Sequence, residues 1–303
     1  MAVSAVFRKL AVLWRLSQRK QIRLGGSEYR LRSFFVNELA LEKGAEAVEP
    51  ALNAVYAATL KCKPGAFLDV GANIGQTLFK ILSMERSREY IGFEPQVSCC
   101  FLVQRFIEEN GLKNHTILPL GLSNRNQIMK LYFREEAYDS SASTIENFRP
   151  ESFYSGYRYI CVRKGDEVVS ELKLPEISTI KIDVEGGELE VLLGLSDTIR
   201  EQQPFIVFEV LNFYLVMSGE KLDEHVIRFR RERIDGMENA LRSTGYDIYQ
   251  VLPEPALKKV ETIQPGTTAD LSATNYVAIP KDQASVFFAS FQGSVQDASL
   301  QAA

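Results

Sequence analysis

From residue 66 the sequence repeats one pattern, a short apolar run followed by a glycine-containing turn and an amphipathic segment of helical period. Apolar runs of this length predict buried strands, and their alternation with helices predicts an α/β fold. The sheet should be doubly wound and mostly parallel, with right-handed crossovers. Ligands of such sheets bind at the carboxyl ends of the strands, near the switch point. The clearest strand candidates are FLDV, EYIGFEP, STIKIDVEG and PFIVFEVL.

The predicted elements divide the chain into three parts. Residues 61–280 carry the repeating pattern and form the main domain. Residues 1–60 lead into it, and the small polar residues after 280 predict a loose tail over 281–303. We predict helices at 3–22, 38–60, 77–86, 97–111, 188–195 and 219–244, with Pro50 at an internal boundary or in a first turn and Thr77 as a cap. Further strands are predicted at 115–123, 127–134, 157–169, 246–252 and 274–280, the last two as a hairpin, with a short strand after the glycines at 25–26 and an irregular excursion over 134–158.

Composition places the chain among ordinary soluble globular proteins. Of its 303 residues, 46% are hydrophobic and 24% are charged, which excludes collagen-like, low-complexity and wholly disordered classes. The net charge of -4 leaves no basic footprint, so no nucleic-acid partner is expected. Residues 1–24 hold six bases and no acid, which leaves 29 bases (35 less 6) against 39 acids in the rest. The head is therefore basic and the body is acidic.

The basic head allows two interpretations. Apolar positions at helical spacing predict an amphipathic helix that lies on an anionic membrane, or an ordinary packed N-terminal helix, which we favour. Charges interrupt AVFRKLAVLWRL too often for a signal-peptide core, and the sequence has no uninterrupted apolar stretch of about 18 residues. We therefore expect a cytoplasmic protein, with peripheral membrane contact through the head as the alternative. The oligomeric state is left open.

The four cysteines favour the same compartment. Cys62, Cys99, Cys100 and Cys161 show no C-x-x-C spacing, and an adjacent pair is awkward for a zinc site. Cys99 and Cys100 lie in an apolar helical run, so we expect buried free thiols there.

The first motif is the turn DVGANIG at residues 69–75, which follows the first strand. Its glycines let the backbone bend sharply, and the next helix points its positive N-terminal end at the same place. The G-x-N-x-G spacing differs from the G-x-G-x-x-G that cradles a dinucleotide pyrophosphate. An acid at the strand end, Asp69, suits a ligand with an amine or hydroxyls and would repel a pyrophosphate. The alternative is a plain turn in which Asp69 satisfies local N–H groups.

The second motif is Glu94, at the end of EYIGFEP and 19 residues after Gly75. An acid about 20 residues beyond a glycine turn accepts hydrogen bonds from the ribose hydroxyls of a nucleoside. An exposed strand-end glutamate is the alternative. Together the two motifs predict a nucleoside-containing cofactor.

Four strings in the sequence resemble one known family. DVGANIGQT, GFEP, LGLSN and above all IKIDVEGGELEVLLG are similar to the FkbM family of S-adenosylmethionine-dependent methyltransferases, and the similarity runs from about Gly65 to Val210. The resemblance implies a seven-stranded, Rossmann-like class I methyltransferase fold and O-methylation of a hydroxyl, often on a sugar or polyketide. It implies S-adenosylmethionine contacts at Asp69, Gly71, Asn73 and Gly75, a ribose contact at Glu94, and Leu120 and Gly121 beside the adenine. We predict that Thr77 joins this cofactor site. Residues 1–60, 134–158 and 219–244 match no motif and are where acceptor specificity would lie.

The third motif combines three charges on one strand. Lys181, Asp183 and Glu185 alternate with apolar residues, which predicts that they share one face of the strand end. A buried central strand seldom carries three charges, so another group must satisfy them. Glu209 should lie beside Asp183 if the two strands are neighbours. We predict that Lys181, Asp183 and Glu185 form the catalytic site, and the alternative is a salt-bridged cluster that closes the sheet.

Methyl transfer to an alcohol requires in-line positioning and removal of a proton. A carboxylate or a histidine can act as the base, or a divalent cation such as Mg²⁺ can lower the pKa of the alcohol. We favour slightly a metal-independent step with Asp183 nearest the methyl group. His115 is expected on the surface, and His225 is expected on a solvated helix face unless that helix caps the site. The arginines between residues 228 and 233 are likewise expected to face solvent.

Two other functions compete with this interpretation. A nicotinamide-dependent oxidoreductase is disfavoured because the dinucleotide glycine pattern is missing. A catalytically inactive nucleoside-binding scaffold would keep the glycine turn and lack a usable base. The acceptor itself, whether a small molecule or a glycan, cannot be identified from these residues.

Overall fold

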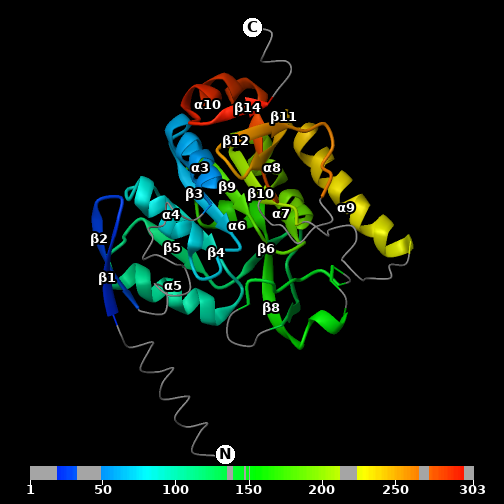
Figure 1. Ribbon diagram of the computed structural model, residues 1–303. Helices are drawn as coiled ribbons and strands as arrows, with labels where there is room; N and C mark the ends of the chain where they lie inside the picture. Colours follow the sequence, from blue (N-terminus) through cyan, green and yellow to red (C-terminus); the bar gives the residue numbers. More distant parts are fainter. Residues whose placement is uncertain are drawn as a thin grey trace, which may run out of the picture.

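A nine-stranded sheet forms the centre of the protein in a computed structural model (Figure 1). The structure describes residues 19–32, 49–134, 139–146, 148–149, 151–211, 224–265 and 273–296. From one edge the strands are β14 (Ser294–Gln296), β12 (Ala256–Lys259), β11 (Tyr246–Leu252), β13 (Asn275–Pro280), β10 (Phe205–Glu209), β9 (Ile177–Ile182), β3 (Ala66–Val70), β4 (Tyr90–Phe93) and β5 (His115–Leu118). None of the helices within these ranges has the length and hydropathy that a bilayer span requires.

The five strands from β10 to β5 run parallel, as the alternation of strands and helices predicts. The chain moves outward from β3 through β4 to β5 and then returns to β9 beside β3, so the switch point lies between β3 and β9. The late strands β11 and β13 pair antiparallel, which confirms their predicted pairing. The sheet has nine strands rather than the predicted seven because β12 and β14 extend it beyond β11.

Helices cover both faces of the sheet, and each face has its own hydrophobic core. One core contains Phe67, Tyr90 and Phe205, and the other contains their strand neighbours Leu68, Ile91 and Ile206, as the two-residue period of strands requires. The first face carries α3 (Pro50–Cys62), α4 (Gln76–Met84), α5 (Val97–Glu109) and α10 (Ala284–Ser290). The second carries α6 (Gly165–Glu171), α7 (Glu188–Gly194), α8 (Ser196–Gln202) and α9 (Glu224–Arg242). The doubly wound prediction is therefore confirmed.

A separate three-stranded sheet lies below the carboxyl edge of the main sheet in Figure 1. It consists of β6 (Gly121–Ser123), β8 (Gly156–Lys164) and β7 (Gln127–Phe133), and a 3-10 helix over Glu151–Phe153 precedes β8. The single strand predicted over 115–123 is wrong, because Pro119 separates β5 from β6 and cannot donate to a sheet ladder. The strand predicted over 157–169 ends at Lys164, where Gly165 begins α6 with acids in its first turn.

The N-terminal part differs from its prediction. Residues 1–18 and 33–48 lie outside the described residues, so neither the basic helix nor its membrane contact is tested there. Residues 19–22, predicted as the end of that helix, belong instead to β1 (Arg19–Leu24), which pairs with β2 (Ser27–Arg32). The strand after the two glycines is thus confirmed as β2. Pro50 is the first residue of α3, as its preference for a first turn predicts.

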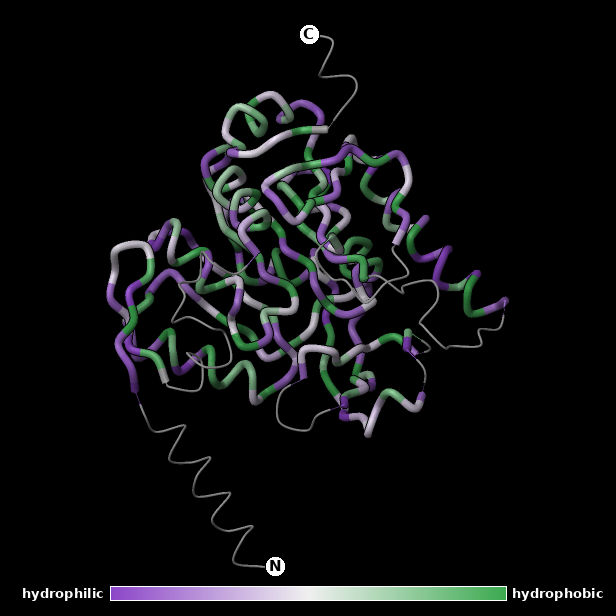
Figure 2. The backbone as a smooth tube through the Cα atoms, in the orientation of Figure 1, coloured by the Kyte–Doolittle hydropathy of each residue, from purple (hydrophilic) through white to green (hydrophobic). Residues whose placement is uncertain are grey.

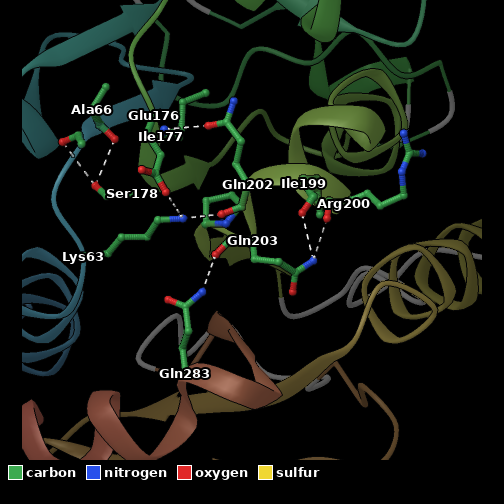
Figure 3. Close-up of polar contacts among 12 residues, drawn as sticks. Lys63, Ala66, Glu176, Ile177, Ser178, Ile199, Arg200, Gln202, Gln203 and Gln283 are labelled. Atoms are coloured by element: carbon green, nitrogen blue, oxygen red, sulfur yellow. Dashed lines mark hydrogen bonds and ion pairs between the residues drawn. The ribbon is translucent and has the colours of Figure 1, made fainter.

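Residues 281–296 form a 3-10 helix, α10 and β14, so the prediction of a loose tail is wrong for them, and residues 297–303 lie outside the described residues. A 3-10 helix over Lys281–Gln283 leads into α10, and the Gln283 side chain donates to the carbonyl of Gln203 at 3.0 Å (Figure 3). Phe287 of α10 is fully buried against the first core. Figure 3 also shows contacts at the amino ends of the strands, opposite the glycine turn. Lys63 forms an ion pair with Glu176, and the Gln202 side chain accepts the backbone N–H of Ile177.

Helix α9 alternates hydrophobic and hydrophilic residues along its length (Figure 2). It buries Ile234, Met237 and Leu241 in the second core. The prediction that its arginines face solvent is wrong for two of them, because Arg230 is 1% and Arg233 is 6% exposed. The guanidinium of Arg233 pairs with the carboxylate of Glu190 on α7, which lies 43 residues away in sequence.

His115 is buried at the start of β5, so the prediction of a surface histidine is wrong. Its ring stacks on Tyr90 with 6.1 Å between centroids, and no hydrogen-bond partner is found for either ring nitrogen among the described residues. Burial, helped by the nearby charge of Arg86, lowers the pKa of His115 to about 4. His115 is therefore neutral in the folded protein at pH 7.

Acid should destabilise the protein through His115. Its folded pKa of about 4 lies below the ordinary value of 6.5, so its stabilising contribution is present above pH 6.5 and is lost as pH falls towards 4. Wild type should therefore lose about 3 kcal/mol more than a His115→Phe variant between pH 7 and pH 4, measured by denaturant unfolding. His225→Gln, at an exposed position of α9, serves as the control. Equal acid sensitivity of wild type and His115→Phe would contradict this assignment.

Candidate active site

A cavity of about 240 Å³ opens at the carboxyl ends of β3, β4, β9 and β10, at the switch point. Eight of the predicted site residues line it, namely Gly71, Asn73, Thr77, Glu94, Gly121, Lys181, Asp183 and Glu185. Asp69, Gly75 and Leu120 are close in sequence but do not line it: Asp69 is fully buried beneath it, Gly75 precedes α4, and Leu120 packs against the second core. The sequence motifs thus converge on one cavity, although they lie up to 116 positions apart (69 to 185).

The glycine turn is built on backbone positions that few residues tolerate. Gly71 has a φ of 85°, and its backbone N–H donates to the carbonyl of Phe93 at 3.0 Å. Asn73 also adopts a left-handed φ of 45°, and its side-chain oxygen accepts from the N–H of Ile74. Asparagine is among the few non-glycine residues that accept this conformation. Thr77, predicted as a cap, is instead the second residue of α4, which begins at Gln76 after Gly75.

Glu94 closes the turn from the neighbouring strand and is 3% exposed. Its carboxylate accepts the backbone N–H of Asn73 at 2.8 Å and that of Gln96 at 2.7 Å. Burial raises the pKa of Glu94 to about 7, although these two N–H groups oppose the shift. A carboxylate has about four acceptor positions, so Glu94 can still accept hydroxyl donors of a ligand in the cavity.

Asp69 and Lys181 form a buried ion pair under the turn. The Lys181 ammonium lies 3.2 Å from a carboxylate oxygen of Asp69 and 3.5 Å from one of Asp183, and it donates to the Gly71 carbonyl at 2.8 Å. Burial acts to lower the pKa of Lys181, but the charges of Asp69 and Asp183 outweigh it and raise the pKa. The Tyr90 hydroxyl donates to the other oxygen of Asp69 at 2.5 Å. Lys181 is therefore a permanent cation that joins the turn to the third motif.

Three carboxylates meet beyond Lys181. One oxygen each of Asp183, Glu185 and Glu209 lie within 4.8 Å of one another, and β9 and β10 are parallel neighbours as predicted. The strand ends at Ile182, so strict alternation does not place Asp183 and Glu185; the turn does, with Glu185 at a φ of 55°. The predicted convergence of Asp183, Glu185 and Glu209 is thus confirmed, although the turn and not the strand produces it.

Protonation of this cluster is shifted towards neutral pH. Burial raises the pKa of Glu185 to about 7, against the opposing charge of Arg149, whose guanidinium lies 2.5 Å away. Burial and the charges of Asp183 and Glu185 raise the pKa of Glu209 well above its ordinary value. The Thr274 hydroxyl donates to Glu209 at 2.8 Å. A carboxyl group with a pKa of about 7, as in Glu185, can accept and release a proton near pH 7.

The excursion over 134–158 packs onto this turn. Besides its ion pair with Glu185, Arg149 donates to the carbonyl of Ser141, and the Ser143 hydroxyl donates to the Glu185 carbonyl at 2.6 Å. Asp139 and Gln96 exchange hydrogen bonds at 2.8 and 3.1 Å. The excursion therefore forms part of the cavity wall, through Asp139, Ser140, Ala142 and Thr144.

Several residues of the site were not anticipated from sequence, among them Glu49, Tyr56, Lys80, Gln96, Asp139 and Arg149. Lys80 had a detectable signal, since it lies three positions after Thr77 and so on the same helix face. Asp139 and Arg149 had none, because their segment follows no regular period. His225 does not line the cavity and stays exposed, as favoured.

A doubly wound sheet with a glycine turn and a buried acid at its switch point has the architecture of a class I methyltransferase. The profile of the methyltransferase FkbM domain matches residues 69–248, more than half of the sequence. The chain therefore belongs to the FkbM methyltransferase family. It spans less than two thirds of the length of the curated relatives that it matches.

Two curated proteins and one solved structure are similar to it. Hexuronic acid methyltransferase AglP of Haloferax volcanii is 27% identical over 172 residues, which are 54% of this chain and 66% of AglP. AMB antimetabolite synthetase AmbE of Pseudomonas aeruginosa is 24% identical over 261 residues, 75% of this chain but 11% of AmbE. A methyltransferase FkbM structure from Methylobacillus flagellatus KT has 17% identity and a TM-score of 0.44, with 71% of this chain and 43% of that one covered.

Replacing Glu94 should weaken cofactor binding. Glu94→Ala removes the predicted acceptor of the ribose hydroxyls and also leaves the N–H groups of Asn73 and Gln96 without their carboxylate partner. We expect a loss of about 1–3 kcal/mol in the binding of S-adenosylhomocysteine, measured by calorimetry. Glu89→Ala, at an exposed position before the same strand, should bind normally. Unchanged affinity of a folded Glu94→Ala variant would mean that Glu94 only holds the turn.

Proposed function

We propose that the protein is an O-methyltransferase that acts on a hydroxyl group of a small molecule, a sugar or glycan, or a polyketide. The observation that carries this proposal is the carboxylate cluster of Asp183, Glu185 and Glu209 in the cavity that also contains Gly71 and Glu94. An alcohol loses its proton as it attacks, so an acceptor for that proton must lie beside the cofactor site. The name of AglP, a hexuronic acid methyltransferase, favours a sugar among these acceptors.

We place each part of S-adenosylmethionine beside residues that line the cavity. We assign the ribose to Glu94, the turn contacts to Gly71 and Asn73, and the adenine side to Gly121 beside Pro95. The chemistry of the donors fits a nucleoside, because Glu94 is buried, lines the cavity and retains acceptor capacity for two hydroxyls. Asp69 and Gly75 act through the turn and Leu120 through packing, so we now assign them no direct contact.

When bound, S-adenosylmethionine supplies a methyl group on a positively charged sulfur that is already a good leaving group. The residues of the chain align the acceptor and receive its proton. Asp183 has 41% of its side chain exposed, against 15% for Glu185, and we assign it the position nearest the acceptor. Glu185 and Glu209 hold a proton close to it, and Lys181 fixes the orientation of Asp183.

Transfer of labelled methyl groups tests this function. The purified protein is incubated with methyl-labelled S-adenosylmethionine and small-molecule fractions of cell extract, and the products are then treated with dilute alkali. A methyl ether survives this treatment, whereas a methyl ester is cleaved. Label that survives alkali and is released as methyl iodide by hot hydroiodic acid, which cleaves methyl ethers, supports O-methylation of a hydroxyl. Label that is wholly released by alkali would identify a carboxyl acceptor and overturn the proposal.

A metal role makes a further test necessary. Three carboxylate oxygens within 4.8 Å suit Mg²⁺, which prefers oxygen ligands and would lower the pKa of an alcohol. We propose a metal-independent step, because Lys181 and Arg149 already balance two of these carboxylates. Activity should therefore survive EDTA. Loss of activity in EDTA and its recovery on addition of Mg²⁺ would establish the metal-dependent alternative.

The boundaries of the catalytic unit are also proposals. We propose that the methyltransferase domain extends beyond the predicted 61–280, from α3 to β14, because α3 and α10 pack on the central sheet and β14 belongs to it. We also propose that residues 1–60 and the excursion contribute to acceptor selection. Membrane contact through the basic head and a cytoplasmic location remain expectations. A nicotinamide oxidoreductase is excluded by the family, and an inactive scaffold is disfavoured by the proton-accepting cluster.

A further inference from the structure

We propose that Lys80 and Glu49 bind the zwitterionic amino-acid end of the cofactor, with Lys80 contacting its carboxylate and Glu49 its ammonium group. The proposal rests on the cofactor placement given above. Both residues line the same cavity as Gly71 and Glu94, at the side formed by α3 and α4. Neither belongs to a motif of the sequence.

The Lys80 side chain is buried and lines the cavity, as expected for a cation that binds a ligand there. It lies on α4 one turn beyond Gln76, and only 5% of its side chain is exposed although it lines a cavity. A lysine in this position is costly to bury unless an anion compensates its charge. Burial lowers the pKa of Lys80, while Glu49 opposes that shift. An anionic ligand in the cavity would supply the same compensation.

Lys80 is also the cation that remains available. Among the residues that line the cavity, the two bases are Lys80 and Lys181. Lys181 is committed to Asp69, Asp183 and the Gly71 carbonyl. Lys80 has three N–H donors, and the contact found for them in the described part of the chain is the carboxylate of Glu49. Two donors are thus left for a second carboxylate.

Glu49 complements Lys80 with the opposite charge. It directly precedes Pro50 at the start of α3, and 52% of its side chain is exposed, so it can move without loss of buried contacts. An amino-acid zwitterion carries one carboxylate and one ammonium on adjacent groups. The Glu49–Lys80 pair offers the matching charges and can open to receive it. The Glu49–Lys80 pair therefore supplies opposite charges for the amino-acid end of the cofactor, which neither Glu94 nor the glycine turn neutralises.

Two ligands that differ only at the amino-acid end test the assignment. S-adenosylhomocysteine carries the carboxylate and its decarboxylated analogue lacks it, while both keep the adenosine and the amine. Lys80→Met should weaken S-adenosylhomocysteine roughly tenfold or more and leave the analogue within about twofold, by calorimetry. Lys80→Arg should restore most of the affinity. Glu49→Gln should weaken both ligands more than 5′-methylthioadenosine, which lacks the whole amino-acid end.

Controls separate this proposal from the cofactor placement on which it rests. Lys113→Met, at an exposed position after α5, should change nothing. Glu94→Ala should weaken all three ligands, because all contain the ribose; if it weakens none, the placement itself is wrong. Equal loss of both ligands in Lys80→Met, or no loss of either, overturns the role of Lys80. If Lys80→Met does not fold, Lys80→Gln is tested with the same ligand pair.

Discussion

Gly71→Val is expected to abolish binding of S-adenosylhomocysteine and to lower the stability of the protein by roughly 3 kcal/mol or more. A Cβ atom on Gly71 would lie 1.8 Å from the backbone oxygen of Asp183 and 2.8 Å from its carbonyl carbon. The backbone must therefore move, and it is the backbone of the turn that carries Asp183 and Glu185. The φ of 85° adds strain, because a β-branched residue rarely adopts it. Calorimetric binding and urea unfolding measure the two effects.

The contribution of the clash can be separated from that of the strain. Gly111 has a φ of 58°, and a Cβ there would meet no atom within 4 Å. Gly111→Val thus imposes a left-handed valine in open space, and it should cost about 1–3 kcal/mol without affecting ligand binding. If Gly71→Val is no more destabilising than Gly111→Val and still binds the ligand, the close approach of the two turns has no functional role.

The reason that Gly71 must be glycine is different from the one its motif suggests. A glycine turn predicts close approach of the backbone to a ligand, whereas the nearest atoms to Gly71 belong to Asp183, 112 positions later. The first and third motifs are therefore one structure, joined by this contact and by Lys181. Sequence reasoning found both motifs because each lies at the end of an apolar strand. It could not find their contact, which depends on the pairing of β3 with β9.

The misassigned elements have local or long-range causes. Pro119 follows β5 and Gly165 follows β8, and both residue types are typical of strand ends, so the sequence contains a local signal for both boundaries. The buried positions of His115 and Arg233 had no such signal, because they depend on partners distant in sequence, Tyr90 and Glu190. Periodicity predicts which face of an element is apolar. It does not predict which polar residue is buried against a remote partner.

Neutralising Asp183 should slow methyl transfer much more than it weakens cofactor binding. Asp183→Asn keeps the size of the side chain but removes the negative charge beside Lys181 and the acceptor of the proton. Loss of a general base reduces turnover by about 10²–10⁴-fold, whereas we expect the affinity for S-adenosylhomocysteine to change by no more than about threefold. Single-turnover methylation and calorimetry on the same preparation give both values. Glu201→Gln, at an exposed position of α8, is the matched control.

Glu185→Gln should affect both the rate of methyl transfer and the stability of the protein, so it distinguishes a catalytic from a structural role less well than Asp183→Asn does. Its carboxylate pairs with Arg149, and this pair holds the excursion on the turn, so the variant should lose thermal stability as well as rate. Asp183 has a more exposed side chain and no comparable role in holding a segment. A purely structural cluster would make activity fall only as the folded fraction falls, in both variants. Full activity in a folded Asp183→Asn protein would therefore remove Asp183 from the chemical step and leave Glu185 or Glu209 as the proton acceptor.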